Sequence, residues 1–108
     1  MHRSALLVCG SLQAASANQA ILDVVTEHLA TVDVAAIDAV SVGDLPLFNP
    51  DEQDRPGPAV VRLRRQIAEA QTVAISAPEY AAALPGALKN ALDWIVGSGE
   101  FYGKPVAV

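Results

Sequence analysis

The chain has 108 residues, which is enough for one domain over residues 1–108 and too few for two. Hydrophobic residues make up 52% of the sequence, so a chain of this length can bury a core. The formal net charge of −5 argues against binding to nucleic acid or to an anionic membrane surface.

The first predicted element is a strand over residues 5–9. This run is continuously apolar, as parallel strands covered on both faces are. It ends at Cys9, the single cysteine of the chain, which excludes an internal disulfide and favours a buried, inert thiol over a nucleophile. The apolar run is too short for a signal-peptide core, and no run approaches the ~20 residues that span a bilayer. We therefore expect a cytoplasmic protein.

A small polar loop over residues 10–18 separates this strand from a helix predicted over residues 17–30. A helix start leaves backbone N–H groups unpaired and carries positive dipole charge, which favours an anion. The side-chain donors of the loop are Ser11, Gln13, Ser16 and Asn18. Because the loop lacks both the dinucleotide glycine fingerprint and the Gly-Lys-Ser/Thr of a P-loop, a terminal phosphate is the favoured ligand. A helix cap without any ligand explains Ser16 and its capping-box partner Gln19 equally well.

Residues 32–38 form the second predicted strand, whose alternating pattern favours a place near a sheet edge. A long irregular connection over residues 39–57 follows, which contains three prolines, two glycines and an acidic group at Asp51, Glu52 and Asp54. A loop of this length in a compact domain is usually functional or covers something. Leu45, Leu47 and Phe48 lie inside it, and we expect them to be buried in the same chain or against a partner subunit.

Pro58 fits the first turn of a second long helix, predicted over residues 58–70. Its apolar residues recur at helical spacing, so one side of the helix should pack on the sheet. Three arginines of this segment are interpreted as its solvated face: Arg62, Arg64 and Arg65.

The last part of the chain repeats the strand-and-helix alternation. A third strand is predicted over residues 72–77, followed by a loop at residues 78–84. A third helix begins at Pro85 and ends at Gly97, and a fourth strand is predicted over residues 104–108.

This alternation predicts an α/β fold with a parallel sheet and right-handed crossovers. Without a dinucleotide fingerprint, the flavodoxin-like strand order 2-1-3-4 is favoured, and its ligand crevice lies between the first and third strands. The loops at residues 10–18 and 78–84 meet at that crevice. A phosphate at the first loop and a planar ring against the small residues of the second suit a mononucleotide such as FMN.

Several motifs resemble those of the NADPH-dependent FMN reductases, a family that includes quinone, chromate and azo-dye reductases. Residues 10–18 resemble the family's Gly-Ser-x-Arg-x-x-Ser-x-Asn loop. Residues 78–81, 85–86 and 88–94 resemble its Pro-Glu-Tyr-Asn, Pro-Gly and Leu-Lys-Asn-Ala-x-Asp-Trp signature. Residues 44–49 resemble the segment that follows the second strand of the family.

The resemblance implies a flavodoxin-like three-layer sandwich that binds FMN. Ser11, Ser16 and Asn18 would bind the FMN phosphate, and Gln13 and Ala17 belong to the same cofactor-binding loop. The residues that would border the ribityl chain and the isoalloxazine ring are Pro78, Glu79, Tyr80 and Ala81.

The resemblance also implies the reaction. NADPH gives a hydride to the flavin, which passes electrons to a small-molecule acceptor, without a side-chain nucleophile or a metal. Family members are commonly dimers or tetramers, so a homodimer or homotetramer is expected. The helix residues Lys89, Asn90, Asp93 and Trp94 would serve helix packing or an interface more than chemistry.

Three departures from the family pattern are visible. Gln13 stands where the family usually has Arg, Ala81 stands where it usually has Asn, and the chain ends before a fifth strand, which indicates truncation at the C-terminus. Two other functions therefore stay open. The protein could be an electron-carrier flavoprotein without an NADPH site, although the phosphate loop of flavodoxins is absent. It could also be a non-catalytic oligomerisation module derived from the enzyme fold.

Overall fold

The computed structural model describes residues 3–12, 17–77, 85–101 and 103–107. The strands are β1 (Ser4–Cys9), β2 (Ala35–Asp38), β3 (Thr72–Ser76) and β4 (Val106–Ala107). The long helices are α1 (Ala17–Thr31), α2 (Pro58–Glu69) and α3 (Gly86–Val96). Two short 3-10 helices, η1 (Val42–Asp44) and η2 (Pro50–Glu52), lie in the connection between β2 and α2.

All strand pairs are parallel, and the sheet has the order β2-β1-β3-β4. This confirms the predicted flavodoxin-like order and the edge position of the second strand. Leu6 of β1 pairs with Ile37 of β2 on one side and with Val73 of β3 on the other. The chain therefore changes direction across the sheet between β1 and β3, where a ligand crevice forms in doubly wound folds.

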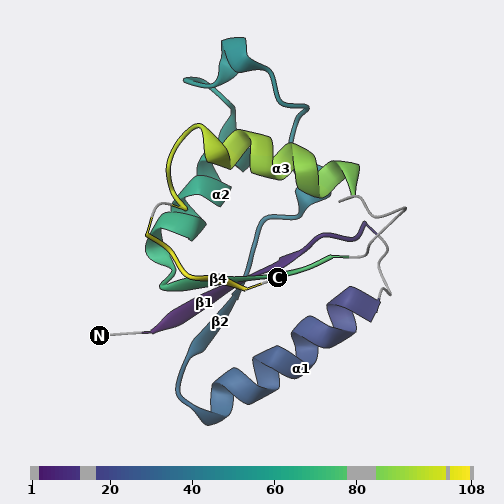
Figure 1. Ribbon diagram of the computed structural model, residues 1–108, viewed down its shortest axis with the longest axis vertical. Helices are drawn as coiled ribbons and strands as arrows, with labels where there is room; N and C mark the ends of the chain where they lie inside the picture. The colour runs from purple at the N-terminus through teal and green to yellow at the C-terminus, as the bar shows by residue number, and fades with distance from the viewer. Residues whose placement is uncertain (1–2, 13–16, 78–84, 102, 108) are drawn as a thin grey trace.

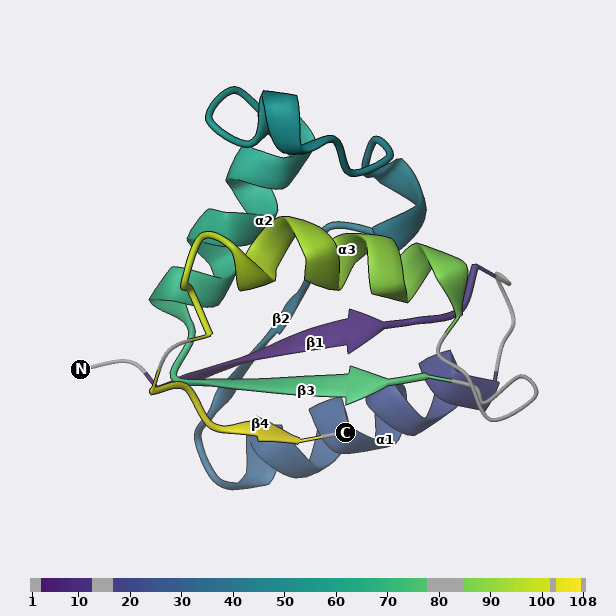
Figure 2. The ribbon, with the colours of Figure 1, turned by 45° about the horizontal axis from the view of Figure 1, so that its top comes forward.

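The molecule has three layers, with α2 and α3 on one face of the sheet and α1 on the other (Figures 1 and 2). Alternation along β1 explains why this strand is apolar throughout. Leu6 and Val8 point into the cluster shared with α2 and α3, whereas Ala5 and Leu7 pack against Leu22 of α1. Both faces of β1 are therefore buried, as its continuous apolar run predicted.

The two faces differ in how completely they are covered. The face under α2 and α3 carries the larger core cluster, in which Trp94 is fully buried. Helical spacing in the sequence predicts that Ile21 and Leu22 share the apolar face of α1. On the α1 side of the sheet Leu22 is buried, but Ile21 is 56% exposed. The prediction is wrong for Ile21 because α1 covers this face alone among the described residues, and the Ile21 side chain lines an open cavity beside β3 and β4.

The second strand begins three residues later than predicted, at Ala35. Asp33 has a positive φ of 61°, and the N–H groups of Val32 and Val34 both donate to the carbonyl of Leu29. These residues form the turn that closes α1 and redirects the chain, so they are unavailable to the sheet.

The fourth strand begins two residues later than predicted, at Val106, and residue 108 lies outside the described residues. The N–H of Lys104 donates to the carbonyl of Phe101 in a turn, and its ammonium group donates to the carbonyls of Ala68 and Ala70 at the end of α2. Lys104 thus caps a helix rather than extending the strand, and pairing with β3 begins at the carbonyl of Pro105.

The connection between β2 and α2 is irregular, as predicted, and two of the three apolar residues expected to be buried are covered by the same chain. Leu45 is 8% exposed, and Phe48 is half-buried against Trp94. Leu47 is 84% exposed, so the expectation of burial within the chain is wrong for this residue.

Arg64 differs from its predicted place on a solvated face, whereas Arg62 and Arg65 are exposed as expected. The Arg64 guanidinium donates to the carbonyl of Gln53 at 3.2 Å and to that of Trp94 at 3.1 Å. It ties the connection to the end of α3, which explains why its side chain is 16% exposed.

Candidate functional site

The carboxyl ends of β1 and β3 lie side by side at the switch point of the sheet. Cys9 pairs with Ser76, and one residue further the N–H of Gly10 donates to the carbonyl of Ser76 at 2.7 Å. The ladder between the strands therefore continues into the first loop. This places the start of that loop beside the start of the loop that follows β3.

Gly10 is required by this close approach. A Cβ atom at position 10 would lie 2.9 Å from the Cβ of Ala77 and 3.1 Å from a methyl carbon of Leu88. The first loop thus leaves the sheet in contact with Ala77, which follows β3, and with Leu88 of α3. A glycine lets the backbone pass where any side chain would separate the two loops.

Asn18 joins the start of α1 to the end of β3. It is the second residue of the helix, is half-buried, and accepts a hydrogen bond at Oδ1 from the hydroxyl of Ser76 at 2.9 Å. Ala17 precedes it as the exposed first residue of α1. The start of α1 is therefore held at the switch point, as the sequence predicted.

Of the predicted cofactor-binding residues, the structure describes Ser11, Ala17 and Asn18. The others lie outside the described residues: Gln13, Ser16, Pro78, Glu79, Tyr80 and Ala81. Ser11 is half-buried, and its carbonyl accepts a weak hydrogen bond from the Cys9 thiol at 3.7 Å. Cys9 is half-buried rather than fully buried as expected, because it lines a cavity.

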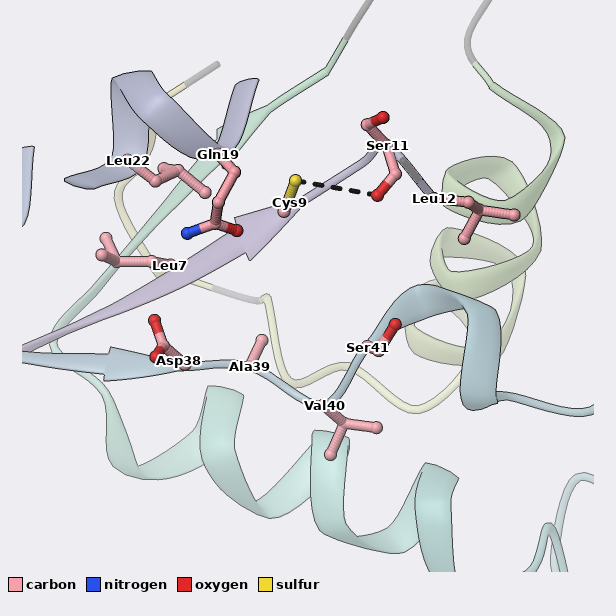
Figure 3. A pocket seen from close by; sticks show the side chains of 10 residues that line it. All are labelled: Leu7, Cys9, Ser11, Leu12, Gln19, Leu22, Asp38, Ala39, Val40 and Ser41. Carbon is pink, nitrogen blue, oxygen red and sulfur yellow. Dashed lines mark hydrogen bonds between the residues drawn. The ribbon is translucent and has the colours of Figure 1, made fainter. Parts of the chain in front are cut away.

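That cavity, shown in Figure 3, has a volume of about 320 Å³ and lies at the carboxyl ends of β1 and β2. Its lining residues are Leu7, Cys9, Ser11, Leu12, Gln19, Leu22, Asp38, Ala39, Val40 and Ser41. Ser11 is the one predicted site residue among them. Asp38 and Ser41 were not predicted to contribute, although the edge position of β2 next to β1 places the end of β2 beside the first loop.

A second cavity, of about 380 Å³, lies on the opposite side of α1, over β3 and β4. Asn18 and Ser76 line this cavity together with apolar residues of α1 such as Ile21 and Val25. The start of α1 therefore has Ser11 and the Asp38 carboxylate on one side, and Asn18 and Ser76 on the other. The helix start lies between the two sides, so an anion bound there would have Ser11 on one side and Asn18 on the other.

The donors at this crevice are neutral. The sequence has no Lys or Arg between residues 4 and 54, so a phosphate here would be held by hydroxyl and amide groups and by the N–H groups of the helix start. These neutral hydrogen-bond donors at a helix start fit a phosphate. Within the described ranges, no cluster of three or more His, Cys, Asp and Glu side chains could hold a metal ion.

The motif on α3 fastens the connection after β2. The amide of Asn90 and the indole N–H of Trp94 both donate to the carbonyl of Pro46 at 2.8 Å, and the N–H of Phe48 donates to Asn90 Oδ1 at 2.7 Å. The rings of Phe48 and Trp94 meet edge to face with centroids 5.0 Å apart. For these residues the predicted role in packing is confirmed.

Comparison with known proteins identifies the family of the chain. The family model described as NADPH-dependent FMN reductase matches residues 4–108. A 2-hydroxy-1,4-benzoquinone reductase of a Burkholderia species is 40% identical over 106 residues, which cover 94% of this chain and 56% of that protein. An NAD(P)H-dependent FMN reductase of Pseudomonas aeruginosa is 36% identical over 105 residues, covering 94% of this chain and 55% of the relative.

A solved structure shows the same fold. The flavoenzyme FerB of Paracoccus denitrificans, an NAD(P)H:acceptor oxidoreductase, superposes with a TM-score of 0.85 at 31% identity, over 96% of this chain and 58% of FerB. The chain thus spans a little over half the length of these relatives. The comparisons confirm the resemblance seen in the motifs and the flavodoxin-like fold.

Proposed function

Because the chain belongs to the NADPH-dependent FMN reductase family, we propose that its protein is an FMN-dependent oxidoreductase that uses NADPH. Electrons pass from NADPH through the flavin to a small-molecule acceptor, such as a quinone or a second flavin. The quinone and FMN reductases among its relatives support this class of acceptor. The observation that carries the proposal is the meeting of Gly10, Asn18 and Ser76 at the switch point of a sheet that has the family's fold.

In this proposal the FMN phosphate lies at the start of α1. Ser11, Ser16 and Asn18 donate to it together with backbone N–H groups, and Gln13 and Ala17 complete the loop. The residues that border the ribityl chain and the isoalloxazine ring are Pro78, Glu79, Tyr80 and Ala81. When bound, FMN supplies the redox chemistry by accepting a hydride and passing on electrons.

The protein's part is to bind and orient. Gly10 lets the first loop approach the connection after β3, so that phosphate and ring sites lie one strand spacing apart. Asn90 and Trp94 immobilise the segment at Pro46–Phe48 on α3, the helix that begins directly after the second loop. Both contacts fix in advance the geometry that cofactor binding needs.

The proposal includes the oligomeric state and the cellular compartment of the protein. We expect a cytoplasmic homodimer or homotetramer that binds neither nucleic acid nor membranes. The acidic charge of the chain supports this, and none of the described helices is both long and apolar enough to cross a bilayer. The exposed Leu47 side chain, held between two fastened neighbours, supports association between copies.

Purification tests the proposed function. We expect a yellow protein, or one that takes up added FMN, and that oxidises NADPH when a quinone is supplied. A yellow protein that does not oxidise NADPH would indicate an electron carrier instead. A colourless protein that takes up no FMN would indicate a non-catalytic module and would overturn the proposal.

A further inference from the structure

Ser76 is the last residue of β3 and is not one of the predicted cofactor-binding residues. Along β3, Val73 and Ile75 point into the core under α2 and α3, whereas Ala74 packs on the α1 side. Because side chains alternate along a strand, Ser76 faces α1 as Ala74 does. Its position on the sheet is fixed, since its carbonyl accepts the hydrogen bond from the N–H of Gly10.

The hydroxyl of Ser76 reaches the helix start and donates to Oδ1 of Asn18 at 2.9 Å. An asparagine side chain has one acceptor end and one donor end, and rotation about its last bond exchanges them. With the acceptor end taken by Ser76, the NH2 group of Asn18 is directed away from Ser76 as a donor. Phosphate oxygens only accept hydrogen bonds, so this is the orientation that a phosphate requires.

We propose that Ser76 is a positioning residue for FMN, which orients the Asn18 amide so that its NH2 group donates to the phosphate. The inference rests on the proposed function, in which the FMN phosphate lies at the start of α1. The orientation of the Asn18 amide matters more here than at a site with an arginine, because residues 4–54 contain no Lys or Arg. An amide can donate to the phosphate only if its NH2 group, and not its oxygen, faces the phosphate.

Equilibrium titration of the flavin-free protein with FMN and with riboflavin tests this role without relying on turnover. Ser76→Ala should weaken FMN binding by roughly 3- to 10-fold, since one hydrogen bond that orients a ligand group is lost. Riboflavin lacks the phosphate, so its affinity should stay the same. Ser76→Thr keeps the hydroxyl and should bind FMN as the unchanged protein does.

A double variant separates positioning from direct contact. If Ser76 acts through Asn18, Ser76→Ala should add no further loss in an Asn18→Ala background. A further loss of the same size, or an equal loss for riboflavin, would overturn the inference, because Ser76 would then act on its own or on the fold. The thermal unfolding of flavin-free Ser76→Ala, expected to be close to that of the unchanged protein, checks the fold.

The same titrations distinguish this inference from the proposed function. If FMN binds and Asn18→Ala weakens it while Ser76→Ala does not, the role of Ser76 is wrong and the phosphate site stands. If the unchanged protein binds no FMN, the proposed function itself fails. If all variants bind FMN equally, the phosphate lies elsewhere and both the site and the role of Ser76 are wrong.

Discussion

Ser11 follows the end of β1 and Asn18 lies in the first turn of α1, so the two side chains flank the proposed phosphate site. Both were selected as phosphate donors from the loop pattern, and the structure places them at the carboxyl end of β1 and at the start of α1. Ser76 could not be found in this way. Its contact with Asn18 joins residues 58 positions apart, and no local pattern reports such a pair.

Ser11→Ala and Asn18→Ala should each weaken FMN binding on the order of 10- to 100-fold, because a hydrogen bond to a charged phosphate contributes more than a neutral one. Fluorescence titration of FMN measures the change. Thr26→Ala is a matched control, since it also removes a hydrogen-bonding side chain from α1 but lies two turns beyond the helix start. Unchanged titration curves for Ser11→Ala and Asn18→Ala would remove the phosphate assignment.

Gly10→Ala should lower the free energy of unfolding by about 1–3 kcal/mol, because the added Cβ meets Ala77 and Leu88 at less than ordinary contact distance. It should also weaken FMN binding, since the two loops are pushed apart. Chemical denaturation measures the stability change. Gly86→Ala is the control, because a Cβ there meets nothing within 4 Å; equal stability losses for both variants would contradict the close-approach argument.

Among the elements, those with continuous or helical apolar patterns were predicted to within one or two residues. β1, α1, α2, β3 and α3 belong to this group. The ends of β2 and β4 were predicted less well, because turns and caps decide them rather than the strand pattern. A positive φ at Asp33 ends the α1 turn, and Lys104 caps α2 instead of entering the sheet.

The environment of Arg64 shows the same limit. Its helical position suggested a solvated face, but its partners are carbonyls 11 and 30 residues away in the chain. By contrast, the α3 motif predicted a packing role for Asn90 and Trp94 correctly. It could not say that their partner is the segment Pro46–Phe48, which follows β2.

Asn90→Ala should lower the free energy of unfolding by about 1–3 kcal/mol, because it leaves the N–H of Phe48 without its acceptor in a half-buried place. Lys89→Ala, on the same helix, removes an exposed ion pair with Asp93 and should change stability by less than about 0.5 kcal/mol. Denaturant unfolding of both variants makes the comparison. Similar losses for the two would show that the Asn90 contacts do not hold the connection.

The folded molecule leaves large apolar side chains exposed, and one of them lies in a segment that hydrogen bonds hold in place. Leu47 is 84% exposed although Phe48 beside it is fastened to α3, so ordering it at an interface costs little entropy. We expect the protein to associate, and Leu47→Asp to shift it toward monomers. Sedimentation velocity over a wide concentration range measures this. A folded monomer at every concentration would contradict the expectation.

The central claim is that FMN binds at the crevice between β1 and β3, with its phosphate at the start of α1. Backbone amide shifts in ¹⁵N-labelled protein, followed while FMN is added, test it most directly. We expect the largest shifts in residues 10–18 and 76–81, and we expect riboflavin to leave the shifts of residues 10–18 nearly unchanged. Shifts centred on residues 38–41 or on α2, with residues 10–18 unaffected, would contradict it.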